Sequence, residues 1–435
     1  MKLSAHSLVS VIIGWMTALF ATMAMAAAPA VPRIEGVEIL PDQGWSGNPD
    51  VIWYDNFDSP EPLLSRYLEA SDQLTTVTSE ALGGSGKSVR ARFGPGSVES
   101  GGIKKTFGRN PMDYRSLGSR KNEDFTEIYW RHYIKHQEGW TGNPNKLSRA
   151  IAFSAADWSE AMIAHIWNGN SNNIAIDPVR GVNADSQVVT SGYNDFDSFT
   201  WLGHQDATTQ IFNTAESGRW VSVEGHVKLN TPGKSDGVFE LYIDGQVEVS
   251  RRTLNWVYSW NDYGINAVFL ENYWGIGSLV KQERFFDDFV ISTSYIGLAN
   301  SPLNPQVTKT SFRDTDVADS QSAWRLQIAS NLDGSDMIWD SAQIEGSGES
   351  IIVDATNGTF LGTLEGHSQL SPGHLYALRV QQRDLIGNWS AWSSWSSSLK
   401  TVATVPEPTS ISIVLMGMAF VTAIRRPCGP KPFLE

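Results

Sequence analysis

Aromatic and basic side chains alternate along residues 127–136, EIYWRHYIKH, where the bulky residue types favour a β-strand. Successive side chains of a strand point to opposite faces, so this stretch divides into two sets. The apolar set is Ile128, Trp130, His132, Ile134 and His136, and the other set is Glu127, Tyr129, Arg131, Tyr133 and Lys135. Flat aromatic rings stack on sugar faces, and the planar guanidinium of Arg binds carboxylates through two hydrogen bonds. The second set is therefore suited to an acidic sugar polymer.

The same division recurs in two later stretches. In residues 161–167 the apolar set is Met162, Ala164 and Ile166, and the other set is Ile163, His165 and Trp167. In residues 219–230 the apolar set is Val221, Val223, Val227 and Leu229, and the other set is Trp220, Ser222, Glu224, His226 and Lys228. A simpler interpretation is that these rings and cations only cover a sheet, with Lys and Arg stems lying over the rings.

These stretches belong to a series of β-type segments bounded by turn residues. The segments are VIWYDNF, SVRARF, EIYWRHYIKH, RAIAF, AMIAHIW, RWVSVEGHVKLN, GVFELYIDG, INAVFLENYW and RFFDDFVIS. Such spacing predicts an antiparallel sandwich over residues 50–298. If the sheets curve as in a jelly roll, the outer face of one sheet forms a groove wide enough for a polysaccharide chain.

Composition agrees with a β protein and opposes nucleic-acid binding. The 435 residues include 17 Trp, only 18% are charged, and the formal net charge is −14. Residues 87–149, however, hold 13 Lys and Arg against 6 Asp and Glu, so this segment is +7 and the remainder is −21. A locally basic region can attract a polyanion. Cys428 is the single cysteine, so no disulfide forms within the chain.

The amino-acid composition and the pattern of strands change after residue 301, which indicates a second domain. The segments SAWRLQIAS, DMIWDS, LSPGHLYALRVQQRD and NWSAWSSWS follow within about a hundred residues, the size of one immunoglobulin-like sandwich. Residues 302–401 resemble a fibronectin type III domain, with Tyr376 as the corner tyrosine and Trp324 as the core tryptophan. Such modules act as spacers or binding domains.

The beginning of the chain has the features of a secretory signal peptide. A lysine is followed by an apolar run and by Ala24-Met25-Ala26, a small-x-small cleavage pattern, so residues 1–26 are predicted to form a helical signal that is removed. A membrane anchor is the alternative. Residues 27–49 are rich in Pro and Gly and are predicted to run as an extended lead-in over the surface.

Residues 405–427 contain Pro406-Glu407-Pro408, a short apolar run and then Arg425-Arg426. This order resembles the PEP-CTERM sorting signal of bacteria. The apolar run is short for a stable span, so it predicts a transient helical anchor in the inner membrane. The resemblance implies processing near Pro406, Glu407 and Pro408 by an exosortase-type protease, and export to the cell surface or the medium. An ordinary tail anchor is the alternative.

The first sandwich resembles a known family over residues 50–297. The quoted segments, together with NPNKLSRAIAF, NAVFLENYWG and FFDDFVIS, are similar in pattern and order to the concanavalin A-like jelly rolls of bacterial alginate and glucuronan lyases. These enzymes cleave uronate polymers by β-elimination, which requires neutralisation of a carboxylate, a base and an acid. The resemblance implies that Arg131 neutralises the carboxylate, that His165 is the base, and that Tyr273, or alternatively Tyr263, is the acid.

The resemblance also implies a substrate-binding surface without a cofactor. Its members are Tyr129, Tyr133, Lys135, Lys146, Arg149, Trp167, Trp220, His226 and Lys228. Hydrolysis is disfavoured because no E-x-D-x-x-E pattern of paired carboxylates occurs. The competing hypothesis is a non-catalytic carbohydrate-binding protein of the cell surface or extracellular matrix.

Two acidic stretches raise the question of calcium. Asp314, Asp316 and Asp319 lack the Gly and terminal Glu of a calcium loop, so we expect a solvated turn there. Asp195 and Asp197 in YNDFDSF are likewise expected to form a turn. The sequence leaves a structural calcium ion open.

Overall fold

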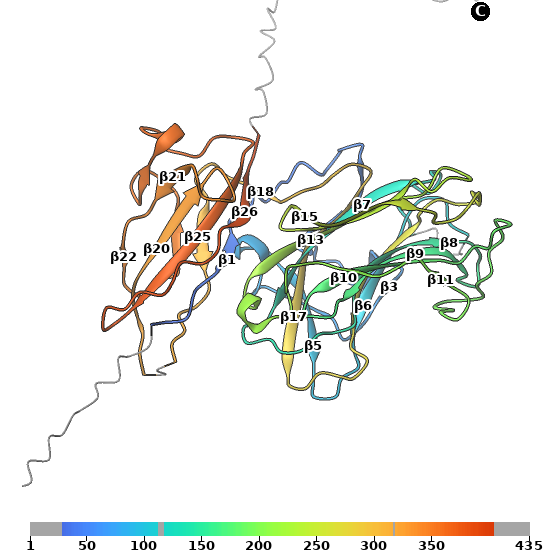
Figure 1. The fold of residues 1–435 in the computed structure, drawn as a ribbon, viewed down its shortest axis with the longest axis horizontal. Helices are drawn as coiled ribbons and strands as arrows, with labels where there is room; N and C mark the ends of the chain where they lie inside the picture. The colour runs from blue at the N-terminus through green and yellow to red at the C-terminus, as the bar shows by residue number, and fades with distance from the viewer. Residues whose placement is uncertain (1–27, 112–116, 316–317, 404–435) are drawn as a thin grey trace, which may run out of the picture.

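The structure is a computed structural model that describes residues 28–111, 117–315 and 318–403. Regular structure in this part of the chain is almost entirely β-strand, as predicted. Its helices are single 3₁₀ turns, η1 (Leu63–Ser65), η2 (Leu82–Gly84), η3 (Thr214–Glu216) and η4 (Gly362–Leu364). Figure 1 shows two β-sandwiches side by side.

The first sandwich consists of two antiparallel sheets, as expected for a jelly roll. Sheet I contains, in spatial order, β15 (Gln246–Leu254), β14 (Gly237–Ile243), β13 (Trp220–Lys228), β7 (Glu127–His136), β17 (Gln282–Ser292), β5 (Ser88–Phe93) and β4 (Thr75–Val77), with β2 (Val51–Asp55) paired to β17. Sheet II contains β11 (Thr200–Trp201), β10 (Ile174–Arg180), β9 (Glu160–Asn168), β8 (Lys146–Phe153), β16 (Ala267–Tyr273), β6 (Glu99–Thr106) and β3 (Glu69–Ala70), with β12 (Gln205–Asp206) paired to β10.

The predicted apolar faces form the core between the two sheets. Ile128, Trp130 and Ile134 of β7 meet Met162, Ala164 and Ile166 of β9 in one buried cluster. Burial of these side chains is the main stabilising term of the sandwich. A Cβ atom on Gly225 of β13 would lie 2.4 Å from the Trp130 ring, so only glycine fits there. The alternation read from the sequence is therefore confirmed for these strands.

The second sandwich includes a strand from the predicted lead-in. One of its sheets contains β18 (Asn300–Ser301), β26 (Ser396–Thr401), β25 (Leu375–Asp384), β20 (Gln321–Ala329), β21 (Met337–Asp340) and β24 (Thr359–Phe360), with β22 (Ile344–Glu345) paired to β20. The other contains β1 (Ile34–Val37), β19 (Gln306–Lys309) and β23 (Ser350–Ile352). Ile34 and Val37 of β1 lie in its core. Residues 34–37 are thus an integral strand rather than a surface segment (Figure 1).

Two side chains singled out in the second sandwich lie where the sequence suggested. Trp324 is fully buried in its core. The Tyr376 hydroxyl accepts a hydrogen bond from the Ser371 N–H at 3.0 Å, so it fastens the turn before β25 to the sheet. The fibronectin type III identity itself stays a prediction.

The outer face of sheet I is covered by the segments that join the two sandwiches. Tyr133, Trp220 and Phe285 pack against Leu298 and Ala299 of the linker. The Lys135 ammonium forms ion pairs with Glu35 at 2.5 Å and Glu80 at 2.7 Å. This contact explains why β7 carries Tyr, Arg and Lys on its second face, since these side chains dock the lead-in and the linker.

Arg131 lies at the centre of this covered face. It is fully buried, and its guanidinium pairs with Asp288 at 2.5 Å and donates a hydrogen bond to the Gly297 carbonyl at 2.8 Å. The Glu224 carboxylate accepts the N–H groups of Ile296 and Gly297, both at 2.9 Å. Arg131 therefore fixes the linker to sheet I, which corrects the expectation that it faces an open groove.

The two chain ends lie outside the described residues. This concerns the predicted signal peptide, residues 1–26, and the predicted sorting segment, residues 405–427, with Pro406, Glu407 and Pro408. Among the residues that are described, no helix combines the length and the apolar character needed to cross a membrane.

A first prediction concerns the contribution of the buried Arg131–Asp288 pair to the free energy of unfolding. Arg131→Met leaves the Asp288 carboxylate buried without its cation, so we expect the free energy of unfolding to fall by about 3–5 kcal/mol. Arg131→Met combined with Asp288→Leu should recover most of this loss, because no buried charge then remains. Urea unfolding followed by Trp fluorescence measures both. Arg92→Met, which breaks the exposed pair with Glu283, is the control and should cost under about 1 kcal/mol. A single variant as stable as the wild type would contradict the structural role.

A second prediction concerns the effect of His132 on the pH dependence of stability. This histidine faces the core from β7, neither ring nitrogen has a hydrogen-bond partner among the described residues, and burial lowers its pKa to about 3, with Arg284 and Arg131 adding to the effect. The unfolded chain binds a proton here below about pH 6.5 and the folded chain does not, so stability is lost as the pH falls. We expect His132→Leu to stabilise by about 2 kcal/mol more at pH 5 than at pH 8, measured by urea unfolding at both pH values. The exposed His367→Leu should show no such difference.

Candidate functional site

The outer face of sheet II carries two cations that a β-bulge brings together. Lys146 and Arg149 are three residues apart on β8, a spacing that regular alternation would place on opposite faces. The register with β9 shifts between Lys146 and Ser148, so Leu147 and Ser148 both face the core. Bulges of this kind redirect a side chain, and here the bulge turns Lys146 outward beside Arg149.

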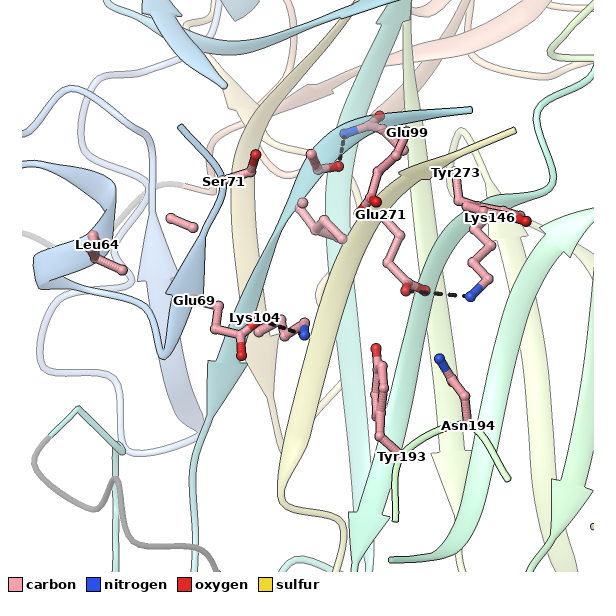
Figure 2. A pocket seen from close by; sticks show the side chains of 15 residues that line it. Leu64, Glu69, Ser71, Glu99, Lys104, Lys146, Tyr193, Asn194, Glu271 and Tyr273 are labelled. Carbon is pink, nitrogen blue, oxygen red and sulfur yellow. Dashed lines mark hydrogen bonds and ion pairs between the residues drawn. The ribbon is translucent and has the colours of Figure 1, made fainter. Parts of the chain in front are cut away.

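Neighbouring strands and one loop bring polar side chains to the same place. Glu271 and Tyr273 come from β16, whose Phe269 pairs with Arg149 across the strands. Tyr193 and Asn194 come from the loop that follows β10. Figure 2 shows Glu271 and Lys146 pointing toward each other, with Tyr193 and the amide nitrogen of Asn194 reaching toward the same space.

Arg149 connects these elements from beneath. It is fully buried, and its guanidinium donates hydrogen bonds to the Asn194 Oδ1 at 2.7 Å, to the Glu271 Oε1 at 2.9 Å and to the Tyr193 hydroxyl. Burial raises the pKa of Tyr193, and the carboxylates of Glu271 and Glu160 add to this rise, so Tyr193 stays protonated. Arg149 therefore fixes the position of three side chains but has no side-chain surface open to solvent.

Of the two cations of β8, Lys146 is the one that reaches the open space. Its ammonium lies 4.0 Å from the Glu271 carboxylate, 5.1 Å from the centre of the Tyr273 ring and 5.5 Å from that of Trp167. Burial lowers the pKa of Lys146, Glu271 opposes this effect, and Arg149 lowers the pKa further. The amine is thus more easily deprotonated than an exposed lysine.

These residues line a cleft of about 530 Å³ that runs from β3 to β8 across β6 and β16. Its charged and hydrogen-bonding side chains include Glu69, Glu99, Lys104, Lys146, Tyr193, Asn194, Glu271 and Tyr273. Lys104 forms an ion pair with Glu69 at 2.5 Å near one end. Beside Lys146, the rings of Trp167, Phe196 and Trp201 form an aromatic wall, and 45% of Trp201 is exposed.

Glu160 supports the loop that carries Asn194. Its carboxylate accepts the Asn194 N–H at 3.0 Å, and burial raises its pKa to about 7 against the opposing effect of Arg149. Asn194 has a φ of 59°, a left-handed conformation that asparagine tolerates better than most residues. In the same loop the Asp195 carboxylate accepts the Ser191 N–H at 2.9 Å, as expected for a turn.

Arg284 supports the cleft from inside the core. This fully buried residue of β17 donates hydrogen bonds to the Asn272 Oδ1 at 3.2 Å and to His136 at 3.1 Å, and it lies 3.4 Å from the Lys146 carbonyl. Burial lowers the pKa of Arg284 to about 9. The rings of Trp140, Phe93 and Phe212 surround its guanidinium, which offsets part of the cost of burial.

His165 shares this sheet face but does not line the cleft. It lies opposite Arg149 on β9 and is fully buried beside Trp167, Phe196 and Trp201. Its Nδ1–H donates to the Asp177 carbonyl at 2.9 Å, which leaves Nε2 unprotonated in the neutral ring. Burial lowers the pKa of His165 well below 6.5, and Arg149 adds to this effect.

The structure divides the residues proposed from the sequence between two faces. Sheet II brings together Lys146, Arg149, His165, Trp167 and Tyr273. The outer face of sheet I holds Tyr129, Arg131, Tyr133, Lys135, Trp220, His226 and Lys228. A core lies between these faces, so Arg131 does not converge with His165 and Tyr273. Tyr263, the alternative acid, lies outside the cleft beside Trp260 and Arg109.

The far end of the sheet I face holds a closed ionic network. The Tyr129 ring stacks on His226 with centres 4.0 Å apart, and His226 binds Glu127 and Glu240, both at 2.9 Å. Lys228 lies 3.4 Å from Glu127. These side chains satisfy one another, which leaves few groups for a ligand.

Several contributors to the cleft were missed by sequence reasoning, among them Glu271, Tyr193, Asn194 and the supporting Glu160. Glu271 stands in the quoted stretch NAVFLENYWG, where its alternation with Phe269 and Tyr273 could have marked it. Tyr193 and Asn194 reach the cleft from a loop, and Glu160 on β9 supports that loop through the Asn194 N–H. No local pattern predicts this.

No protein-family model matches the chain, and no curated protein matches it. Solved structures similar to part of the chain include polysaccharide lyases. The endo-β-1,4-glucuronan lyase of the fungus Trichoderma reesei is 14% identical over 56% of this chain and 96% of its own, with a TM-score of 0.38. The PL-14 alginate lyase of Aplysia kurodai is 13% identical over 56% and 99%, with a TM-score of 0.37. Alginate lyase vAL-1 from Chlorella virus is 12% identical over 56% and 100%, with a TM-score of 0.40.

Proposed function

We propose that the chain is a polysaccharide lyase that cleaves an acidic, uronate-containing polymer by β-elimination in the sheet II cleft. The observation that carries this proposal is the convergence of the Lys146 amine, the Asn194 amide and the Tyr273 ring around one open space. An amine with a lowered pKa, a polarised amide and a phenol correspond to the base, the carboxylate-binding group and the acid that β-elimination needs.

The substrate carboxylate would bind at Asn194. Its Oδ1 accepts a hydrogen bond from the buried Arg149, which polarises the amide and makes its Nδ2 hydrogens stronger donors. Hydrogen bonding to the carboxylate makes the neighbouring C5 proton more acidic. Arg149 acts here as a positioning residue, because its guanidinium is fully buried and its two terminal nitrogens already donate to Asn194, Glu271 and Tyr193.

We place the base at Lys146. Its neutral amine can take the C5 proton, and burial favours that neutral form. His165 has an unprotonated Nε2, but the ring is fully buried beside the aromatic wall and lies outside the cleft lining. We therefore propose that His165 has a structural role: its ring packs against the aromatic wall and its Nδ1–H binds the Asp177 carbonyl of β10.

Tyr273 is the proposed acid. It is 38% exposed, lines the cleft and lies beside Lys146, so its hydroxyl can protonate the leaving glycosidic oxygen. The reaction transfers one proton to the enzyme and one proton from it. Lys146 gains the C5 proton, the C4–O bond breaks as the C4–C5 double bond forms, and Tyr273 gives its proton to the departing oxygen.

Non-catalytic sugar binding is the second candidate function. The exposed ring of Trp201 beside the cleft favours it, because stacking on a sugar needs no proton transfer. In either case we propose that the protein is exported and that its carboxyl end is processed by an exosortase-type protease, as the two terminal segments predict.

The activity makes a third prediction. Incubation of the full chain with alginate, glucuronan and related polyuronates should raise ultraviolet absorbance as unsaturated uronate ends form. Lys146→Arg keeps the charge but cannot deprotonate, so the rate should fall at least about 100-fold, and Tyr273→Phe should act similarly. Lys234→Arg and Tyr295→Phe, exposed and remote from the cleft, are the matched controls. No absorbance change on any substrate, with retention on an immobilised polyuronate that Trp201→Ala weakens, would favour the binding protein.

The pH dependence makes a fourth prediction that separates the two candidate bases. If Lys146 is the base, kcat/KM rises with pH until the amine is neutral, and the midpoint lies below the ordinary lysine pKa of about 10.4. If His165 is the base, its pKa well below 6.5 makes the rate independent of pH between about 7 and 9. Initial rates on the preferred polyuronate over this interval decide between the two.

A further inference from the structure

Three carboxylates meet at one end of the second sandwich. Asp314 and Asp319 precede β20, and Asp384 is the last residue of β25, the strand beside β20. One oxygen of each carboxylate lies within 4.8 Å of one oxygen of the other two. This group is separate from the sheet II cleft.

Asp384 is the member that points to a ligand. Its side chain is fully buried, its Oδ1 accepts the Asn388 N–H at 2.7 Å, and its Oδ2 has no hydrogen-bond partner among the described residues. A buried carboxylate oxygen without a partner is costly unless a cation or a proton compensates it.

Two of the three acids, Asp319 and Asp384, have no cationic partner in the part of the chain that the structure describes. The nearby Arg383 and Arg325 pair instead with Glu345 and Asp340. Asp319 uses its Oδ1 to accept the Ser320 N–H at 2.7 Å and the Leu385 N–H at 3.2 Å, which fixes it against the turn after β25.

The residue that pairs with Asp384 across the strands carries an uncharged amide. Gln321 lies directly opposite Asp384 across the strands and is 6% exposed. Its Nε2 donates to the Gly346 and Gly348 carbonyls, which fixes the orientation of the amide, and its Oε1 has no hydrogen-bond partner among the described residues. Directly opposite residues share a face, so the Gln321 side chain lies on the same face of the sheet as Asp384 and carries a second buried oxygen without a partner among the described residues.

We propose that Asp314, Asp319 and Asp384 bind a divalent cation, and that this cation is Ca²⁺. Like charges so close together repel unless a cation binds among them. All the donors are oxygens, as hard cations require, and Ca²⁺ accepts several carboxylates in a flexible geometry, whereas Mg²⁺ demands a near-ideal octahedron and keeps several waters. The ion ties the segment before β20 to the end of β25 and so stabilises the second sandwich. The sequence alone predicts only a solvated turn there, because Asp384 is distant along the chain.

Calorimetric titration of the chelator-treated full chain with CaCl₂ tests the proposal. We expect one Ca²⁺ per chain, weaker binding of MgCl₂, and a rise of at least about 5 °C in a melting transition at saturating Ca²⁺. Asp384→Asn keeps the shape and the Asn388 hydrogen bond but loses the charge, so it should abolish this rise and the binding. Asp319→Asn is a second variant in case Asp384→Asn does not fold.

The exposed Asp333→Asn, whose Oδ1 caps a turn through Ser335, is the matched control and should bind Ca²⁺ as the wild type does. Absence of Ca²⁺ binding to the folded wild type overturns the proposal. Binding that survives both Asp384→Asn and Asp319→Asn also overturns it, since the ion would then lie elsewhere, for example among the acids of the cleft.

Discussion

The cleft on sheet II depends on the hydrogen bonds of one buried guanidinium. Arg149 has no contact with solvent, so its charge has to be compensated by groups brought from other parts of the chain. Glu271 comes from the adjacent strand, and Tyr193 and Asn194 come from a loop about 45 residues farther along the chain. Because the strand β16 and this loop must both meet β8 at Arg149, the positions of the side chains above it are fixed. The β8 bulge then adds Lys146 to this fixed group.

The two outer faces of the first sandwich have similar compositions but different surroundings. Both carry Trp, His, Lys and Arg, yet the sheet I face is largely covered by the linker and the lead-in, whereas the sheet II face keeps an open cleft. On sheet I the cations find protein carboxylates, as with Arg131 and Asp288. On sheet II the Lys146 ammonium remains 4.0 Å from its nearest carboxylate, which leaves room for another group. The covering of a face, rather than its composition, distinguishes a docking surface from a binding surface.

Much of the fold could be predicted from the sequence, because a strand that buries one face must alternate. The segments of β7, β9 and β13 show this alternation, and it assigned Trp130 to the core and His165 to an outer face. Alternation cannot say which outer face another segment covers, and this is why Arg131 was grouped with His165. Nor can it predict a bulge, which needs one extra residue and no particular side chain. Glu160 and Asp384 contribute through long-range contacts, which leave no local pattern.

The strand β1 has a consequence for how the chain folds during synthesis. Residues 34–37 pair with residues 307–309, so the whole jelly roll is inserted between the first strand of the second sandwich and its remaining strands. A ribosome therefore produces this first strand long before its partners exist. The jelly roll can bury its own core in the meantime, while β1 has to wait for the last third of the chain. Contacts so distant in sequence form slowly, so we infer that the second sandwich is the last unit to fold.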